Sequence, residues 1–135
     1  MKKVSLILLC VATIGMLSCK KETYVSNANN LTLIKYIEPS AWALSNDGFT
    51  YSATIMDNNI DNRTYADDGI LVYISRGNAN YYEQIPFVYD AQTYSYTVTP
   101  GSISIDIQSS DFQEATPIKP SSTMRVKIVL LESMQ

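Results

Sequence analysis

The sequence contains no histidine among its 135 residues and only two cysteines. Without histidine, the chain cannot build a Ser-His-Asp triad, a Cys-His pair or a histidine-ligated metal site. It also has no glycine-rich phosphate loop followed by a lysine. A pair of carboxylates is the one catalytic scheme left open without a cofactor, and no spacing of acids selects such a pair. We therefore expect no cofactor and no enzyme activity.

Positive charge is also scarce. The chain has 10 Lys and Arg against 13 Asp and Glu, and its formal net charge is -3 at pH 7. A nucleic-acid-binding protein needs a basic face that neutralises phosphates, so we expect no nucleic acid as a partner. The hydrophobic share of 46% and the charged share of 17% are typical of a folded globular chain.

The N-terminal segment has the pattern of an export signal. A short basic start precedes an apolar run from Val4 to Leu17, which is too short to span a membrane and the right length for a signal peptide. The run ends in Ser18 and Cys19, which resembles the lipobox read by bacterial lipoprotein signal peptidase. We predict a lipoprotein signal peptide over residues 1–18 and lipidation of Cys19. The alternative is an ordinary cleaved signal with an incidental cysteine.

Cysteine counting agrees with a lipid anchor. Cleavage before Cys19 removes Cys10, so the remaining chain has one cysteine and cannot form an internal disulfide. Residues 19–30 then form the lipidated cysteine and a flexible tether. The tract Lys20-Lys21-Glu22 resembles the charged tract that follows the lipidated cysteine in surface lipoproteins. We expect an outer-membrane location, and the sequence leaves the cell surface and the periplasm both open.

Residues 31–135 have the pattern of one all-β domain. Runs rich in Thr, Tyr, Ile and Val alternate with turn residues. They predict a single antiparallel β-sandwich of about seven strands, immunoglobulin-like or related, without a substantial helix. Pro86 lies inside the fourth run and places it at a sheet edge or a bulge. The predicted strands are Leu31–Ile37, Phe49–Met56, Ile70–Ser75, Tyr81–Tyr89, Tyr94–Thr99, Ser102–Gln108 and Met124–Leu131.

The order of several short motifs is similar to that of small uncharacterised lipoproteins of the Bacteroidota. The resemblance covers most of residues 40–131, and its motifs are structural. It implies an all-β domain on a lipid anchor and transfers no activity. The motifs are Trp42, Tyr51-Ser52-Ala53-Thr54-Ile55, Asp68-Gly69-Ile70-Leu71-Val72-Tyr73, Gln84-Ile85-Pro86-Phe87, Tyr94-Ser95-Tyr96 and Arg125-Val126-Lys127-Ile128-Val129.

One acidic, amide-rich stretch is a candidate calcium loop. Asp57, Asn59, Asp61 and Asp68 fall at positions 1, 3, 5 and 12, where such loops place oxygen ligands. Asn62 stands at the sixth position, where glycine is expected, and the flanks have the pattern of strands. The alternative is a polar connection between two strands, in which Asn and Asp serve turn chemistry.

Three aromatic residues are candidates for stacking on a sugar ring. Trp42, Tyr81 and Tyr82 have flat apolar faces with polar edges, which suit such a ligand. The alternative is that they are core residues and cross-strand pairs, as most tyrosines of a β-rich chain are. Trp42 follows Pro39 and precedes the second predicted strand, so the sequence leaves its burial open.

These observations predict a non-enzymatic, lipid-anchored envelope or surface lipoprotein with an interaction role. Its partners would be the membrane, through the N-terminal lipid, and a glycan or a protein. Two alternatives remain open at this stage. One is a carbohydrate-binding module of an outer-membrane system, and the other is a structural or adhesion subunit that uses strand pairing.

Overall fold

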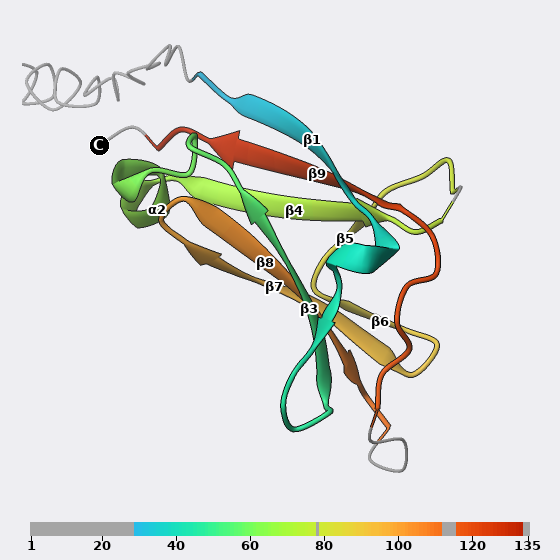
Figure 1. Cartoon of the computed structure of the whole chain (residues 1–135). Helices are drawn as coiled ribbons and strands as arrows, with labels where there is room; N and C mark the ends of the chain where they lie inside the picture. Colours follow the sequence, from blue (N-terminus) through green and yellow to red (C-terminus); the bar gives the residue numbers. More distant parts are fainter. Residues whose placement is uncertain (1–28, 78, 112–115, 134–135) are drawn as a thin grey trace, which may run out of the picture.

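The computed structural model describes residues 29–77, 79–111 and 116–133, which form two antiparallel sheets packed face to face (Figure 1). The predicted all-β sandwich is confirmed. The signal peptide, Cys19 and most of the tether lie outside the described residues. The four-stranded sheet has the order β1 (Leu31–Ile37), β9 (Met124–Leu131), β4 (Gly69–Ser75), β5 (Glu83–Gln84). The five-stranded sheet has the order β2 (Ala43–Leu44), β3 (Thr50–Met56), β8 (Ser102–Ser109), β7 (Gln92–Thr99), β6 (Phe87–Tyr89).

The core lies between the sheets and follows the two-residue period of the strands. Ile103, Ile105 and Ile107 of β8 are completely buried, as are Val126 and Ile128 of β9. The residues between them in each strand face outward, because successive side chains of a strand point to opposite sides. Each of these two strands is paired on both sides within its own sheet. Together they form the centre of the hydrophobic core.

The strand boundaries follow the sequence patterns closely, except at proline. β1 and β9 span the residues that the sequence predicts. The fourth predicted run is divided: β5 pairs with β4, and β6 pairs with β7 of the other sheet. Pro86 lies between the two pieces and cannot donate a ladder hydrogen bond. The chain therefore passes from one sheet to the other at this point, with an edge strand on each side.

Two short helical segments and one short strand were not predicted. The 3-10 helix η1 (Pro39–Ala41) follows β1, and the two-residue strand β2 comes next. Helix α2 (Asn62–Asp67) lies in the candidate calcium stretch, and Asp61 caps it by accepting a hydrogen bond from the backbone N–H of Thr64 at 2.8 Å. Thr64 is its one buried residue, so the helix has no apolar stripe that a sequence pattern could reveal. Within the described ranges, no helix has the length and apolar character that a membrane span requires.

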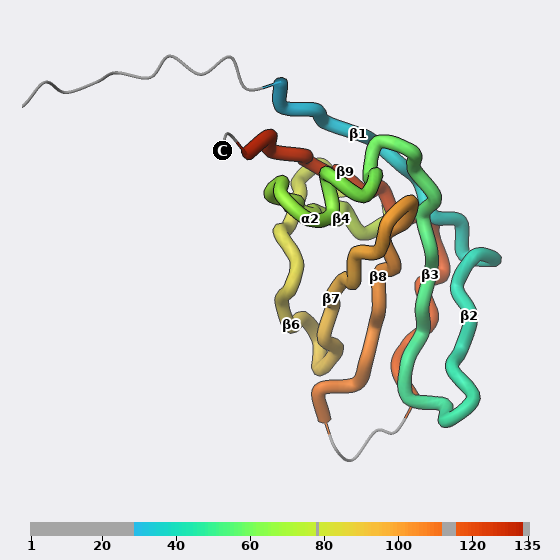
Figure 2. The backbone as a smooth tube through the Cα atoms, turned by 90° about the vertical axis from the view of Figure 1, so that its left-hand side faces the viewer, coloured from blue at the N-terminus to red at the C-terminus, as the bar shows by residue number. Residues whose placement is uncertain are grey.

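The two ends of the sandwich are formed by different elements. The start of β1, the end of β9 and helix α2 lie together at one end, and the β2–β3 hairpin points to the other (Figure 2). Phe49 lies at the tip of that hairpin and is 52% exposed. The described chain therefore begins beside α2. The hairpin end is the part of the domain farthest from that point.

The buried isoleucines of β8 set the stability of the fold. We expect Ile105→Ala to lower the free energy of unfolding by about 2–5 kcal/mol, because it removes buried methyl groups and leaves a cavity. Thr97→Val is the matched control on the exposed face of the neighbouring strand β7, with an expected change within about 0.5 kcal/mol. Urea denaturation followed by circular dichroism measures both. Equal effects of the two variants would contradict this account of the core.

Candidate functional site

The four candidate calcium ligands have other partners in the structure. Asp61 caps α2, and Asp68 accepts a hydrogen bond from the backbone N–H of Ser133 at 3.0 Å. Asp57 accepts from the backbone and side-chain nitrogens of Asn59 at 2.9 and 2.7 Å. Among the described residues, no group of three or more Asp, Glu, Cys or His is placed to hold a metal ion. The geometry supports the alternative, a polar connection that caps a helix and secures the chain ends.

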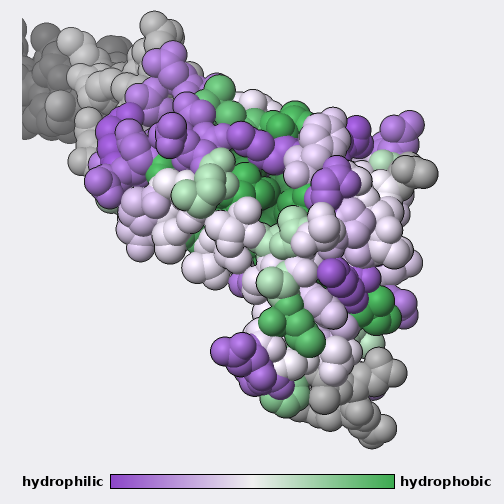
Figure 3. Space-filling model, in the orientation of Figure 1, coloured by the Kyte–Doolittle hydropathy of each residue, from purple (hydrophilic) through white to green (hydrophobic). Residues whose placement is uncertain are grey.

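Asp57 also forms an ion pair that joins the two sheets. Its carboxylate lies 2.6 Å from Nζ of Lys35, which reaches inward from the edge strand β1. Burial alone raises the pKa of Asp57, but the hydrogen bonds from Lys35 and Asn59 outweigh it, so the pKa lies below its ordinary value. Figure 3 shows hydrophobic surface in the middle of this side of the molecule, between the positions of β9 and β3 in Figure 1. An inward lysine also protects an edge strand from pairing with another chain.

Trp42 is not a stacking residue, and the expectation that it could hold a sugar ring is wrong. Its side chain is 3% exposed and belongs to the hydrophobic core. Its indole Nε1 is buried and has no hydrogen-bond partner in the described chain. The 3-10 helix after β1 turns the chain just before Trp42, so the indole enters the sandwich rather than solvent. The sequence left these two placements open because no period covers the segment.

The structure separates Tyr81 and Tyr82. Tyr81 is 57% exposed, and Tyr82 is half-buried beneath two cations of strand β9. Cζ of Arg125 lies 4.7 Å from the centroid of the Tyr82 ring, and Nζ of Lys127 lies 4.5 Å from it. Tyr82 thus belongs to the same surface as Arg125 and Lys127, whereas Tyr81 has no such contact among those described.

That surface is the outer side of the four-stranded sheet. We call it the cation–tyrosine face, and it comprises Tyr36, Tyr73, Tyr82, Arg125 and Lys127. The strand register places Arg125 directly between Tyr36 of β1 and the end of β4, and it pairs Lys127 with Tyr73. Nζ of Lys127 lies 4.4 Å from the Tyr73 ring centroid. Arg125 and Lys127 are two residues apart on one strand, which separates them by about 7 Å along it.

The two cations of this face differ electrostatically from most others in the structure. Lys35, Arg63 and Arg76 each lie within 4.0 Å of a carboxylate. Arg125 and Lys127 have no carboxylate at that distance within residues 29–77, 79–111 and 116–133, and Nε of Arg125 is buried without a hydrogen-bond partner there. Their charges are held on tyrosine rings by cation–π attraction, which leaves them free to attract an anion.

Arg76 shows the contrasting arrangement. Its Nε and Nη2 both donate to Oε2 of Glu83, at 2.9 and 2.8 Å, and its Cζ lies 3.6 Å from the Tyr89 ring centroid. The Phe87 and Tyr94 rings stack beside it with centroids 5.1 Å apart, and burial raises the pKa of Tyr94. This cluster joins the loop after β4 to the five-stranded sheet. We assign it a structural role because its cation already has a carboxylate partner.

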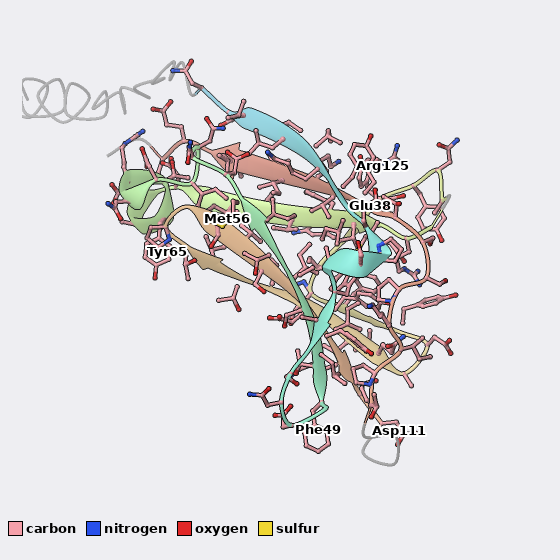
Figure 4. All side chains as sticks on the ribbon, viewed as in Figure 1. Glu38, Phe49, Met56, Tyr65, Asp111 and Arg125 are labelled. Atoms are coloured by element: carbon pink, nitrogen blue, oxygen red, sulfur yellow. The ribbon has the colours of Figure 1, made fainter. Side chains whose placement is uncertain are left out.

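A hollow opens at the end of the cation–tyrosine face. Its volume is about 280 Å³, and Tyr36, Ser75, Asn80, Thr123 and Arg125 contribute to its lining. Glu38 lies close by, because its Oε2 accepts a hydrogen bond from the Thr123 hydroxyl at 2.7 Å. Figure 4 shows Glu38 and Arg125 at the same end of the sheet. Hydroxyl, amide and guanidinium groups therefore line one small recess, and the Ser75 hydroxyl donates to the carbonyl of Ala79 at 2.8 Å.

The sequence reasoning missed Arg125 and Lys127. Both were assigned to the last strand without a role, although their two-residue spacing already placed them on the outer side of it. Tyr73 comes from β4 and Tyr82 directly precedes β5, and only the sheet order reveals that they meet the two cations. No family model matches the chain, and no curated protein or solved structure matches it either.

The Lys35–Asp57 pair predicts a specific dependence of stability on pH. The lowered pKa of Asp57 means that its contribution is present above about pH 4 and is lost as the pH falls through the folded-state value. We expect Asp57→Asn to lower the free energy of unfolding by about 1–3 kcal/mol at neutral pH, and by less in acid. Urea denaturation at both pH values measures the change.

The control is a double-mutant cycle with Lys35→Met. The double variant should lose less than the sum of the two single variants at neutral pH, because the interaction is removed once. Additive losses, or a loss from Asp57→Asn that is equal at both pH values, would show that the pair does not couple the sheets.

Proposed function

We propose that the chain is a non-enzymatic, lipid-anchored envelope protein that acts by binding, and that the cation–tyrosine face is its binding surface. The lipid on Cys19 would hold it to the outer membrane, with residues 20–28 as the tether. The observation that carries the binding role is the pair of unneutralised cations, Arg125 and Lys127, lying on tyrosine rings on an open sheet face. Structural cations in the same domain have carboxylate partners.

The arrangement of the ends is compatible with display from a membrane. The described chain begins with Asn29, next to the start of β1, and the strands of the four-stranded sheet extend away from this junction. A flexible tether of nine residues spans about 15–18 Å, so the domain would stand clear of the lipid head groups. The cation–tyrosine face would then be accessible along its length.

A carbohydrate-binding module is the second candidate, and one observation favours it. Tyr36 is 64% exposed beside Arg125, and Tyr73 and Tyr82 lie on the same sheet face. These three rings are the candidates for stacking on a sugar, because Trp42 is buried. Strand pairing has weaker support, because β9 already pairs with β1 and β4, and the free edge of β1 carries the inward Lys35.

The lipid anchor is tested by Cys19→Ala in intact cells. We expect the variant to leave the membrane fraction, because a thioether-linked lipid can form only on that cysteine. Immunoblots of fractionated cells measure the distribution, and Cys10→Ala is the matched control that should stay with the membrane. A Cys19→Ala protein as firmly bound as the parent would refute the anchor. Protease treatment of intact cells then separates surface display from a periplasmic orientation.

A further inference from the structure

We infer that the cation–tyrosine face binds an acidic polysaccharide, a glycan whose sugar rings carry carboxylates. The inference rests on the binding role proposed above and names the class of ligand. It depends on three properties of the face: its charge, its exposed rings, and the recess beside Arg125.

The charge of the face is opposite to that of the chain. The whole protein carries a formal charge of -3, yet the outer side of the four-stranded sheet presents Arg125 and Lys127. Glu38 is the acid that a described interaction places at its end, through Thr123. Counting that acid, the face keeps one net positive charge. A local positive region on an acidic protein attracts anions to that face, while the net-negative remainder of the surface repels them.

The rings supply the second property. Tyr36 is the cross-strand neighbour of Arg125, and its ring is mostly exposed. An exposed tyrosine offers an apolar face for the C–H side of a sugar ring and a hydroxyl for its polar edge. A sugar that rests on Tyr36 can thus direct a carboxylate to the neighbouring guanidinium. Lys127 lies about 7 Å further along β9, next to Ile34 and Tyr73. It would bind the carboxylate of another sugar in the same polysaccharide.

The recess adds directional contacts. It has about 280 Å³, close to the lower end of pockets that hold small molecules. Ser75, Asn80 and Thr123 bring hydroxyl and amide groups to the same space as Arg125. The hydroxyls of Thr123 and Ser75 already donate to Glu38 and to the carbonyl of Ala79, so only their lone pairs are left for a ligand. A sugar hydroxyl can donate to these oxygens, whereas an inorganic anion without a proton to donate cannot. This favours a glycan over an unspecific counter-ion.

The same features argue against a membrane as the partner. Docking on a bilayer requires several exposed aliphatic side chains beside the cations. On the outer side of the four-stranded sheet, Ile34 is the exposed aliphatic residue, at 44%, while Leu71, Val129 and Leu131 are half-buried. The cations also lie against tyrosine rings of the sheet rather than extending from it. The face thus presents two cations against tyrosine rings, with one exposed aliphatic side chain beside them.

The test uses polygalacturonate, a polymer of an acidic sugar, and the full-length protein in a neutral detergent. Retardation in gels that contain the polymer measures binding. We expect the parent protein to be retarded by polygalacturonate, and much less by the same polymer after methyl esterification, which removes the charges but keeps the sugar rings. Added salt should weaken the retardation, because exposed charges are screened.

Matched variants assign the binding to the face. Lys127→Gln and Tyr36→Ala should each weaken binding by about tenfold, the effect of losing one charged or stacking contact. Lys119→Gln and Tyr65→Ala are the controls, since they remove an equal charge and another exposed tyrosine ring outside the face. Thermal unfolding followed by circular dichroism confirms that the variants are folded. Equal losses in the control variants would overturn the inference.

Three further results would also overturn it. These are an absence of retardation, equal binding of the methyl ester, and equal binding of polyglutamate, which carries carboxylates without sugar rings. A membrane partner is examined by amine labelling of Lys127 in reconstituted vesicles, with Lys119 as the internal reference. If added polygalacturonate protects Lys127 from labelling, the inference is supported. If phosphatidylglycerol in the vesicles protects Lys127 instead, the inference is refuted. The gel measurements do not depend on Cys19, so a failed anchor and a failed ligand assignment are distinguishable.

Discussion

The fold depends on one layer of branched aliphatic side chains held between two sheets without any cross-link. Both cysteines lie within the first 19 residues, so no disulfide can form within the sandwich. The alternation of β8 and β9 therefore has to supply the stability, with Ile105 and Ile128 at its centre. A one-residue slip in either strand would expose that entire layer, because the side-chain period of a strand is two. The register of the neighbouring strands is fixed by this requirement.

Because the inner faces are alike in chemistry, the outer faces distinguish the two sheets. The five-stranded sheet exposes mainly serine and threonine side chains from β3, β7 and β8. The four-stranded sheet exposes tyrosines and the two cations of β9. Hydroxyl side chains on a strand are satisfied by water and by one another. Cations without carboxylate partners are satisfied better by an anion, so we place the binding function on the second of these surfaces.

Two ion pairs connect separate parts of the sandwich. Lys35 pairs with Asp57 between the two sheets, and Arg76 pairs with Glu83 where the chain passes between the sheets. Both pairs are partly buried. Their carboxylates are engaged in local hydrogen bonds, which limits their use as catalytic or metal-binding groups. In the acidic stretch after β3, Asp57 and Asp61 accept local hydrogen bonds, so the stretch has the spacing of a calcium loop and the geometry of a helix-capping connection.

The sequence by itself determined the strands and the core. Alternation over β1 and β9 placed both strands at their observed ends, and Pro86 marked the break between β5 and β6, because these signals are local. Local signals could not decide the burial of Trp42, the cap that Asp61 forms, or the meeting of Tyr36, Tyr73 and Tyr82 around Arg125 and Lys127. Those depend on which strands are neighbours, and strands far apart in the chain become neighbours only when the sheets close. The tertiary structure alone therefore created the cation–tyrosine face.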